Sequence, residues 1–334
     1  MDHRSAVAES HHRTPPDWAI PLPIMDDAPW RVDEDSAGLR LDKYLATRLG
    51  SRGRASTALQ RGKVFVNEHE VGPTDAGARL AAGDAVRVWM DRPGSAHRRA
   101  LRRAGSGELE ILYQDEALVV VNKPAGLLTV PLVHRGDSSV ADQLLAHFHS
   151  RGKRRPLVVH RIDRDTSGLV MFAMHPEAHA RLKEQFKRHE PERVYLAVVY
   201  GHPSPPSGTW RDHLVWDQRS LIQKATHPRD ARGKDARSEY RVVETFKDTA
   251  LIEVRLVTGK RNQIRLQARL RGHTLVGEQR YVYGPDDLRF IDFPRQALHA
   301  YRLAVRHPMD GRSLRLEAPL PADLVELMTR LRRG

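Results

Sequence analysis

The chain has 334 residues, of which 40% are hydrophobic, so it is long and apolar enough to bury a core and is not a disordered chain. Its 55 basic and 42 acidic residues give a formal net charge of +13 and a pI of about 10.2, which favours a polyanionic partner, nucleic acid before an acidic membrane. The sequence has no Cys, which excludes disulfides and thiolate metal sites, and no apolar run approaches the roughly 20 residues of a membrane span, so we expect a cytoplasmic protein without a membrane partner.

The N-terminal part divides into a tail, a compact unit and a linker. Residues 1–30 are rich in Pro and His without periodicity, which is typical of a disordered tail. In residues 31–92, apolar spacing predicts helices at 41–49 and 51–59, followed by a small hairpin, and hence a small α/β domain. The concentration of basic residues there predicts an RNA-binding face. Its candidate residues are Arg40, Lys43, Arg52, Arg54, Arg61 and Lys63. A basic linker follows at 93–107.

The remaining residues, 108–334, are predicted to form one domain. Two strand patterns precede Lys123 and Pro124. Because proline fixes its own φ and restricts the residue before it, a structural role is the preferred interpretation for both. Ser139 and Asp142 have the spacing of a capping box at the start of a helix with a core-facing apolar side.

This domain is organised around the polar run 160–168, His-Arg-Ile-Asp-Arg-Asp-Thr-Ser-Gly, which lies between apolar runs at 157–159 and 169–173. We interpret the apolar runs as buried strands and the polar run as the loop that joins them. Asp163, with an arginine on either side, indicates a reactive carboxylate that faces an anionic substrate. The residues alone leave open an ordinary hairpin with a surface ion pair.

The next segments carry a pair of histidines and a tyrosine. His175 and His179 flank the start of a predicted helix at the spacing of a zinc pair, but no third ligand is evident, so we expect a solvated helix face and no metal. Residues 193–201 alternate as a strand that carries Tyr195, a residue that could pack in the core or take part in proton movement. Residues 203–237 are predicted as an irregular, basic surface insertion against RNA.

The C-terminal part is predicted to contain further strands and two helices. Residues 258–272 predict a basic helix on which Arg261, Arg265 and Arg269 share one face. His299 is interpreted as a core histidine, and the last helix carries an apolar stripe for the core.

Three of these blocks resemble motifs of the RluA-type pseudouridine synthase family. Residues 160–169 are similar to His-Arg-(Leu/Ile)-Asp-x-x-Thr-Ser-Gly-Leu, and residues 193–201 to (Lys/Arg)-x-Tyr-x-Ala-x-Val-x-Gly. Residues 258–265 are similar to Thr-Gly-Arg-x-x-Gln-(Ile/Leu)-Arg, with Lys260 and Asn262 where Arg and His are more usual. The small domain at 31–92 resembles the RNA-binding module of ribosomal small-subunit protein four.

The resemblance implies an α+β fold with a mostly antiparallel central sheet and flanking helices. It also implies that uridine in RNA is isomerised to pseudouridine without a cofactor or a metal. Catalysis would fall to Asp163, with Tyr195 stacked on the target base and Arg265 paired with Asp163. Substrate contacts are expected from Arg161, which in the family fills the space left by the flipped base, and from Ile264, Arg164 and Thr166.

The expected substrate is large-subunit ribosomal RNA, acted on by a monomer, and the sequence leaves the modified position open. Transfer RNA is the alternative substrate. A non-catalytic RNA-binding or ribosome-assembly factor with the same fold is the alternative from another functional class. A glycosidase-like RNA hydrolase would need a second carboxylate at a defined separation from Asp163, for which Asp165 is the candidate. Asp163 could attack covalently or remove a sugar proton.

Overall fold

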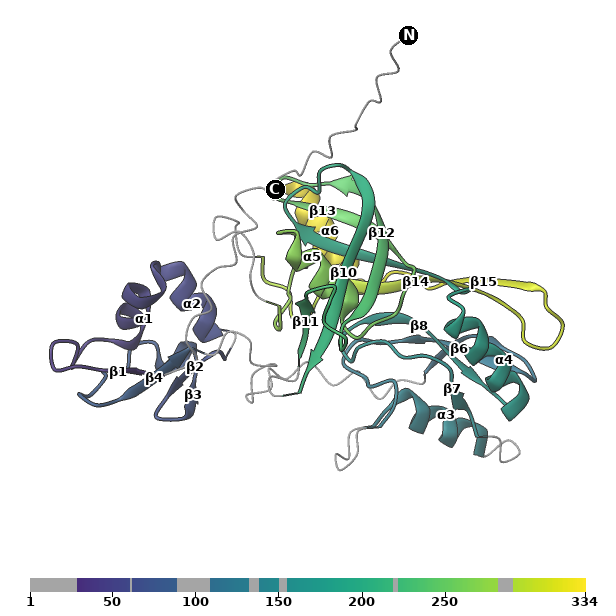
Figure 1. Ribbon diagram of the computed structural model, residues 1–334, viewed down its shortest axis with the longest axis horizontal. Coiled ribbons are helices and arrows are strands. Elements are labelled where there is room, and N and C mark those ends of the chain that lie inside the picture. The colour runs from purple at the N-terminus through teal and green to yellow at the C-terminus, as the bar shows by residue number, and fades with distance from the viewer. Residues whose placement is uncertain are drawn as a thin grey trace, which may run out of the picture.

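A computed structural model describes residues 29–60, 62–88, 109–131, 138–149, 155–218, 222–281 and 291–334. These residues form a four-stranded sheet near the N-terminus and an 11-stranded sheet in the rest of the chain (Figure 1). The predicted linker, Arg61 and residues 1–28 of the predicted tail lie outside the described residues.

The N-terminal unit packs two helices on its small sheet. Its elements are β1 (Trp30–Arg31), α1 (Leu41–Leu49), α2 (Arg52–Gln60), β2 (Val64–Val66), β3 (His69–Val71), the 3₁₀ turn Pro73–Asp75 and β4 (Ala85–Val88). The strand order is β1-β4-β2-β3. Ser51 caps α2 by accepting a hydrogen bond from the Arg54 backbone N–H at 3.1 Å. The two predicted helices are confirmed to within one residue at each end.

The large sheet is mostly antiparallel. Its strands are β5 (Glu110–Gln114), β6 (Leu118–Lys123), β7 (Leu157–Val158), β8 (Ser167–Ala173), β9 (Glu192–Tyr200), β10 (Ser207–Asp217), β11 (Ile222–Thr226), β12 (Lys234–Thr245), β13 (Thr249–Leu256), β14 (Leu298–Arg306) and β15 (Ser313–Glu317). The order is β11-β10-β12-β13-β9-β14-β8-β6-β5, with β15 beside β14 and β7 beside β8. Among these pairs only β8 and β14 run parallel. The predicted α+β class is confirmed.

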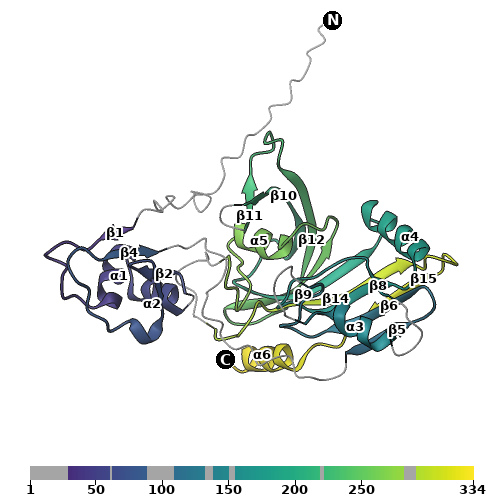
Figure 2. The ribbon, with the colours of Figure 1, turned by 90° about the horizontal axis from the view of Figure 1, so that it is seen from below.

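Four helices cover the two faces of this sheet. They are α3 (Val140–His149), α4 (Pro176–Lys187), α5 (Gln263–Leu270) and α6 (Ala322–Arg333). Alternate side chains of β6 and β9 enter different core clusters, because successive residues of a strand point to opposite faces. Helices α3 and α5 pack on one face, and α4 and α6 pack on the other. Figure 2 shows α6 on the side of the sheet away from α5.

The predicted irregular insertion at 203–237 is wrong, because most of it is regular sheet. β10 pairs with β12 from Ser207 to Leu214, and β10 and β11 form a hairpin. Trp210 stacks on Tyr240 at 4.7 Å between ring centroids. Only one face of these strands is buried, so charged residues fill the alternate positions and conceal the strand pattern in the sequence.

Two smaller expectations also need correction. His175 and His179 are not a solvated pair: the Nδ1 of His175 accepts a hydrogen bond from the Ala178 N–H at 3.3 Å, and the Nε2 of His179 lies 3.0 Å from the Val158 oxygen. Helix α5 begins at Gln263, so Arg261 precedes the helix and does not share its face.

Candidate active site

The candidate active site is built on the loop between β7 and β8, residues 159–166. Lys123 is fully buried beside this loop, and its Nζ donates to three carbonyl oxygens at 2.8 Å, including that of Arg164. Burial lowers the pKa of Lys123 to about 7. The Oγ1 of Thr129 donates to the Ile162 carbonyl at 2.9 Å and holds another part of the loop. Lys123 therefore takes the structural role that the sequence predicts for it.

The exit of the loop is fixed by the parallel contact between β8 and β14. Gly168 has a φ of +108°, and a Cβ there would lie 2.2 Å from the carbonyl oxygen of Ala300. Only glycine combines that backbone conformation with so close an approach. The Oγ of Ser167 lies 2.9 Å from Nδ1 of His299, which is fully buried, and burial lowers the pKa of His299 to about 4. The interpretation of His299 as a core histidine is confirmed.

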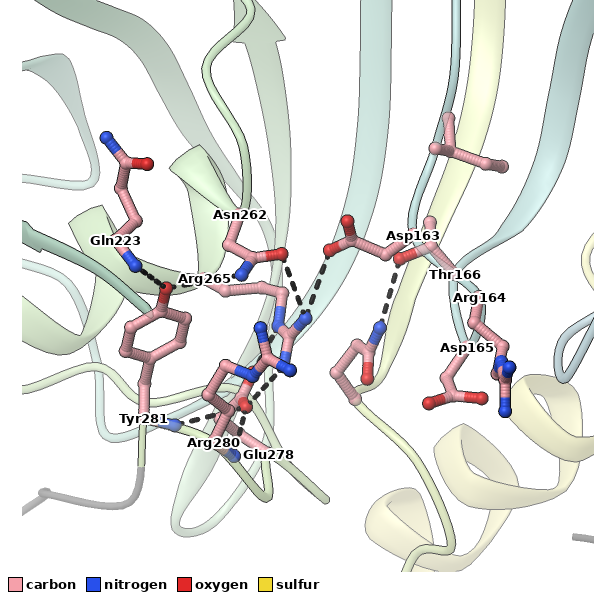
Figure 3. A network of polar contacts seen from close by, with 12 residues as sticks. Asp163, Arg164, Asp165, Thr166, Gln223, Asn262, Arg265, Glu278, Arg280 and Tyr281 are labelled. Carbon is pink, nitrogen blue, oxygen red and sulfur yellow. Dashed lines mark hydrogen bonds and ion pairs between the residues drawn. The ribbon is translucent and has the colours of Figure 1, made fainter. Parts of the chain in front are cut away.

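Asp163 and Arg265 form an ion pair at the centre of the site. The Nη1 of Arg265 lies 3.0 Å from Oδ2 of Asp163, and its Nε and Nη2 each lie 2.6 Å from an oxygen of Glu278 (Figure 3). The side chain of Glu278 is 0% exposed, whereas that of Asp163 is 27% exposed. One guanidinium thus holds two carboxylates, of which only Asp163 is open to a substrate.

The charges of this trio stabilise one another. Burial alone would raise the pKa of Glu278, but the Arg265 charge and its hydrogen bonds lower that pKa to about 2. Burial alone would lower the pKa of Arg265, but Glu278 and Asp163 raise it above its ordinary value. Arg265 is therefore a permanent cation at a fixed position.

A second set of hydrogen bonds holds Arg265 from the side of the β10–β11 hairpin. The Oδ1 of Asn262 accepts from Nη1 of Arg265 at 3.2 Å, and its Nδ2 donates to the Tyr281 hydroxyl at 3.2 Å. The same hydroxyl accepts from the backbone N–H of Gln223, in β11, at 3.2 Å (Figure 3). Asn262 has a φ of +52°, a conformation that asparagine tolerates better than most residues.

Tyr195 and Ile264 are the buried apolar residues predicted for this site. They share one core cluster with Ile162, which precedes the acid. Burial raises the pKa of the Tyr195 hydroxyl to about 12, and the Asp163 charge acts in the same direction, so the phenol stays protonated at neutral pH. The register of β14 shifts by one residue opposite Tyr195, a bulge of the kind found beside active sites.

Two arginines lie at the outer side of the site. Arg161 is exposed on the loop between β7 and β8. The guanidinium of Arg261 stacks on the ring of Trp216 at 4.0 Å. Burial lowers the pKa of Arg261, and the charges of Arg161 and Asp163 then act on it in opposite directions, so the three groups lie near one another. This cationic surface suits a polyanion.

Other predicted contacts of the loop lie away from the pair. The Asp163 carboxylate points toward Arg265, whereas the side chains of Arg164 and Asp165 point away from it (Figure 3). Thr166 is 2% exposed, and its Oγ1 accepts a hydrogen bond from Gln296 at 3.1 Å. These positions favour structural roles for Arg164 and Thr166. Burial raises the pKa of Asp165, and the charges of Arg265 and Asp163 both act on it, so this second carboxylate lies near the pair.

Most of the predicted RNA-binding residues of the N-terminal unit are on its surface. Arg40 is 49% exposed and pairs with Asp42 at 2.8 Å. Three further basic residues of α1 and α2 are exposed: Lys43, Arg52 and Arg54. The prediction that Lys63 binds RNA is wrong, because its side chain is 0% exposed and cannot reach RNA in this conformation.

Sequence reasoning missed Glu278, which does as much as any residue to fix Arg265. The sequence does carry a signal for this residue: Glu278 is a single acid that directly follows block 272–277, part of which is buried. Gly277 makes the turn possible, because its φ is +73° and a Cβ there would lie only 1.9 Å from the Arg295 carbonyl oxygen.

Within the described ranges, no three His, Cys, Asp or Glu side chains are grouped as metal ligands would be. None of the helices described here is long and apolar enough to cross a membrane.

Comparisons with known proteins agree with this geometry. Residues 117–270 match the family described as RNA pseudouridylate synthase. The ribosomal large subunit pseudouridine synthase D of Zymomonas mobilis is 36% identical over 307 residues, which cover 88% of this chain and 94% of that protein. The chain belongs to the RNA pseudouridine synthase family. The resemblance seen in the sequence motifs is thereby confirmed.

Further relatives extend over most of this pseudouridine synthase. An uncharacterized RNA pseudouridine synthase of Bacillus subtilis is 36% identical and covers 91% of this chain and 97% of its own. The ribosomal large subunit pseudouridine synthase D of Nitrosomonas europaea is 32% identical, with 90% and 87% covered. The human RNA pseudouridylate synthase domain containing 4 has the same fold, with a TM-score of 0.56 at 22% identity, over 67% of this chain and 93% of its own. The protein is an isomerase that acts on RNA.

Proposed function

We propose that this pseudouridine synthase modifies uridine in large-subunit ribosomal RNA, with Asp163 as the catalytic residue and the target base flipped out of the RNA. The observation that carries the proposal is the ion pair of 3.0 Å between Arg265 and the one carboxylate of the trio that is partly exposed. The choice of RNA is supported by the relatives named for the large ribosomal subunit and by the basic N-terminal unit.

The reaction rearranges bonds within one nucleotide. The bond between N1 of uracil and C1′ of the ribose breaks, the uracil turns, and C5 bonds to C1′ in its place. C5 then loses its proton and N1 gains one, so atoms and electrons balance without another reactant. Asp163 supplies the acidic oxygen beside the ribose, and Arg265 orients it and provides its counter-charge. Tyr195 and Ile264 supply apolar surface against which the detached uracil can be retained.

Base flipping is supported by the position of Asp163 in the loop between β7 and β8, on a rigid sheet. A carboxylate that is 27% exposed can reach the ribose–base junction only after the nucleotide leaves the RNA stack. Arg161 is exposed two residues before Asp163, where it can occupy the space that the base leaves and contact the backbone. The target uridine would then lie between the catalytic loop and the start of α5.

The test is tritium release from RNA labelled at uridine C5. We expect wild-type protein to release tritium without releasing free uracil, and Asp163→Asn to release none while it binds RNA almost as well. Asp235→Asn, at an exposed aspartate of β12, is the matched control and should behave as wild type. Free uracil would indicate a hydrolase, and RNA binding without either product would indicate a non-catalytic factor. Turnover by Asp163→Asn would contradict the catalytic assignment.

The substrate is tested separately from the chemistry. Pseudouridine positions can be mapped in ribosomal and transfer RNA from cells with and without the protein. We expect positions to be lost from large-subunit ribosomal RNA. A loss confined to transfer RNA would leave the chemistry in place and overturn the choice of substrate.

A further inference from the structure

One guanidinium near the site has, among the residues that the structure describes, no partner that accounts for its charge. Arg193, near the start of β9, lies between the ring of Phe186, 5.6 Å away, and the backbone of Gly259. A Cβ at Gly259 would lie 2.4 Å from the Nη1 of Arg193, so the guanidinium packs directly on this glycine. The sequence Thr258-Gly259-Lys260, which precedes α5, therefore forms one side of the Arg193 environment.

Among the residues that the structure describes, no hydrogen bond or ion pair reaches the Arg193 guanidinium, and its Nε is buried without a partner. Arg193 is half-buried, which lowers its pKa, and within the described part of the chain no carboxylate offsets that cost. By comparison, the buried guanidinium of Arg295 pairs with Asp323 at 2.7 Å. A buried charge is costly to the free protein unless an anion binds it.

The surroundings of Arg193 are cationic and adjoin the catalytic residues. Burial lowers the pKa of His189, and the charges of Arg193 and Lys260 both lower it further, so the three groups lie close together. Arg193 and Tyr195 are two residues apart in β9, so their side chains share one face of the strand at a spacing of about 7 Å. Tyr195 is the residue expected to contact the target base. A backbone phosphate next to that nucleotide would then lie near Arg193.

We propose that Arg193, with Lys260 beside it, binds a phosphodiester group of the RNA strand that carries the target uridine. The inference rests on the proposed function in taking RNA as the source of the anion. The phosphate supplies the negative charge and the acceptor oxygens that a guanidinium needs, in the planar geometry that arginine recognises. Binding at this position fixes the ribose of the flipped nucleotide relative to Asp163.

The experiment measures binding of a short labelled oligouridylate and of unmodified, transcribed large-subunit ribosomal RNA to the full chain over a series of KCl concentrations. For Arg193→Gln we expect about tenfold weaker binding, and a slope of log affinity against log salt that is smaller by about 1 than in wild type. Arg193→Lys should restore most of the slope. Arg241→Gln is the matched control, since it removes one exposed arginine whose charge is already paired with Glu253 at 3.1 Å.

A second readout separates phosphate binding from a structural role. Removal of an uncompensated, half-buried charge should leave the melting temperature of the free protein unchanged or raise it, whereas removal of a group that stabilises the fold would lower it. Gly259→Ala displaces the guanidinium without changing net charge, and should weaken RNA binding although Arg193 is still present.

RNA binding by both Arg193→Gln and Gly259→Ala that equals that of Arg241→Gln would overturn the phosphate site. If wild type then still released tritium from uridine C5, the proposed function would stand without the phosphate site. Conversely, the expected salt slopes without any tritium release would support the phosphate site and contradict the proposed chemistry.

Discussion

At the scale of single residues, the site depends on how one arginine is shared between two acids. Arg265 directs Nε and Nη2 to Glu278, which leaves Nη1 for Asp163. Because Glu278 is fully buried and bonded in a bidentate manner, it determines the plane of the guanidinium. Asp163 receives a donor whose direction is already fixed, so Glu278 is a positioning residue that acts through Arg265.

We therefore expect Glu278→Gln to lower kcat about 10–100-fold, because a small displacement of Arg265 changes the position of the Asp163 carboxylate. The substitution also leaves a buried guanidinium with one partner fewer, and should cost roughly 3–5 kcal/mol of unfolding free energy. Tritium release under saturating RNA and urea unfolding are the measurements. Glu244→Gln makes the same change in an exposed pair with Arg332 and should leave both nearly unaltered.

At the scale of elements, the catalytic loop has a fixed shape because its neighbours are tied to it on several sides. Lys123 lies at the end of β6, and its ammonium donates to three carbonyl oxygens, of which that of Arg164 lies in the middle of the loop. The start of β8 is held against β14 by the pairing of Gly168 with Ala300. A carboxylate on a loop can be placed as accurately as one on a strand when the loop backbone is bonded in this way.

The tightest of these contacts gives a prediction about stability. Gly168→Ala should lower the free energy of unfolding by more than about 3 kcal/mol and abolish tritium release, because steric overlap and backbone strain each cost about 1–3 kcal/mol. Gly311→Ala, in the turn after β14, is the matched control: its φ is +75°, but nothing lies within 4 Å of an added Cβ. We expect Gly311→Ala to lower the free energy of unfolding by about 1–2 kcal/mol. Equal losses in urea unfolding would contradict the steric argument.

At the scale of the whole molecule, the chain carries a net charge of +13, and exposed basic residues lie both on the N-terminal unit and at the outer side of the site. Lys43 and Arg52 are exposed on α1 and α2, while Arg161 and Arg261 lie near Asp163. Contacts to phosphate position an RNA without specifying its sequence, which is read through contacts to the bases. The N-terminal unit would therefore contribute affinity, and the large sheet would contribute chemistry.

This division predicts that Lys43→Gln combined with Arg52→Gln raises KM for ribosomal RNA and leaves kcat nearly unchanged. The salt slope of RNA binding should fall by about 0.7–0.9 for each phosphate that the variant no longer neutralises. Lys187→Gln combined with Arg188→Gln removes the same charge from the exposed end of α4 and serves as the control. An unchanged slope in the first variant would show that this surface of the N-terminal unit does not contact RNA.

The sequence by itself determined the class of fold and most of the helices. It also predicted Asp163, Tyr195 and Arg265 as site residues, because each lies in a contiguous motif whose residues are close in the chain. It misread residues 203–237, since strands with one solvated face carry too many charges to show clear apolar alternation. It also placed Lys63 on the surface, although basic side chains of a small unit can be buried when they are bonded.

Only the tertiary structure decided what holds the catalytic pair. Asp163 and Arg265 are 102 residues apart, and Glu278 joins them from a third segment. Arg193 lacks a counter-ion among the described residues, and this is likewise invisible in the sequence, because it depends on which groups the fold brings near the guanidinium. Local motifs encode which groups are present, but distances between distant segments arise from sheet pairing, and electrostatic interactions depend on those distances.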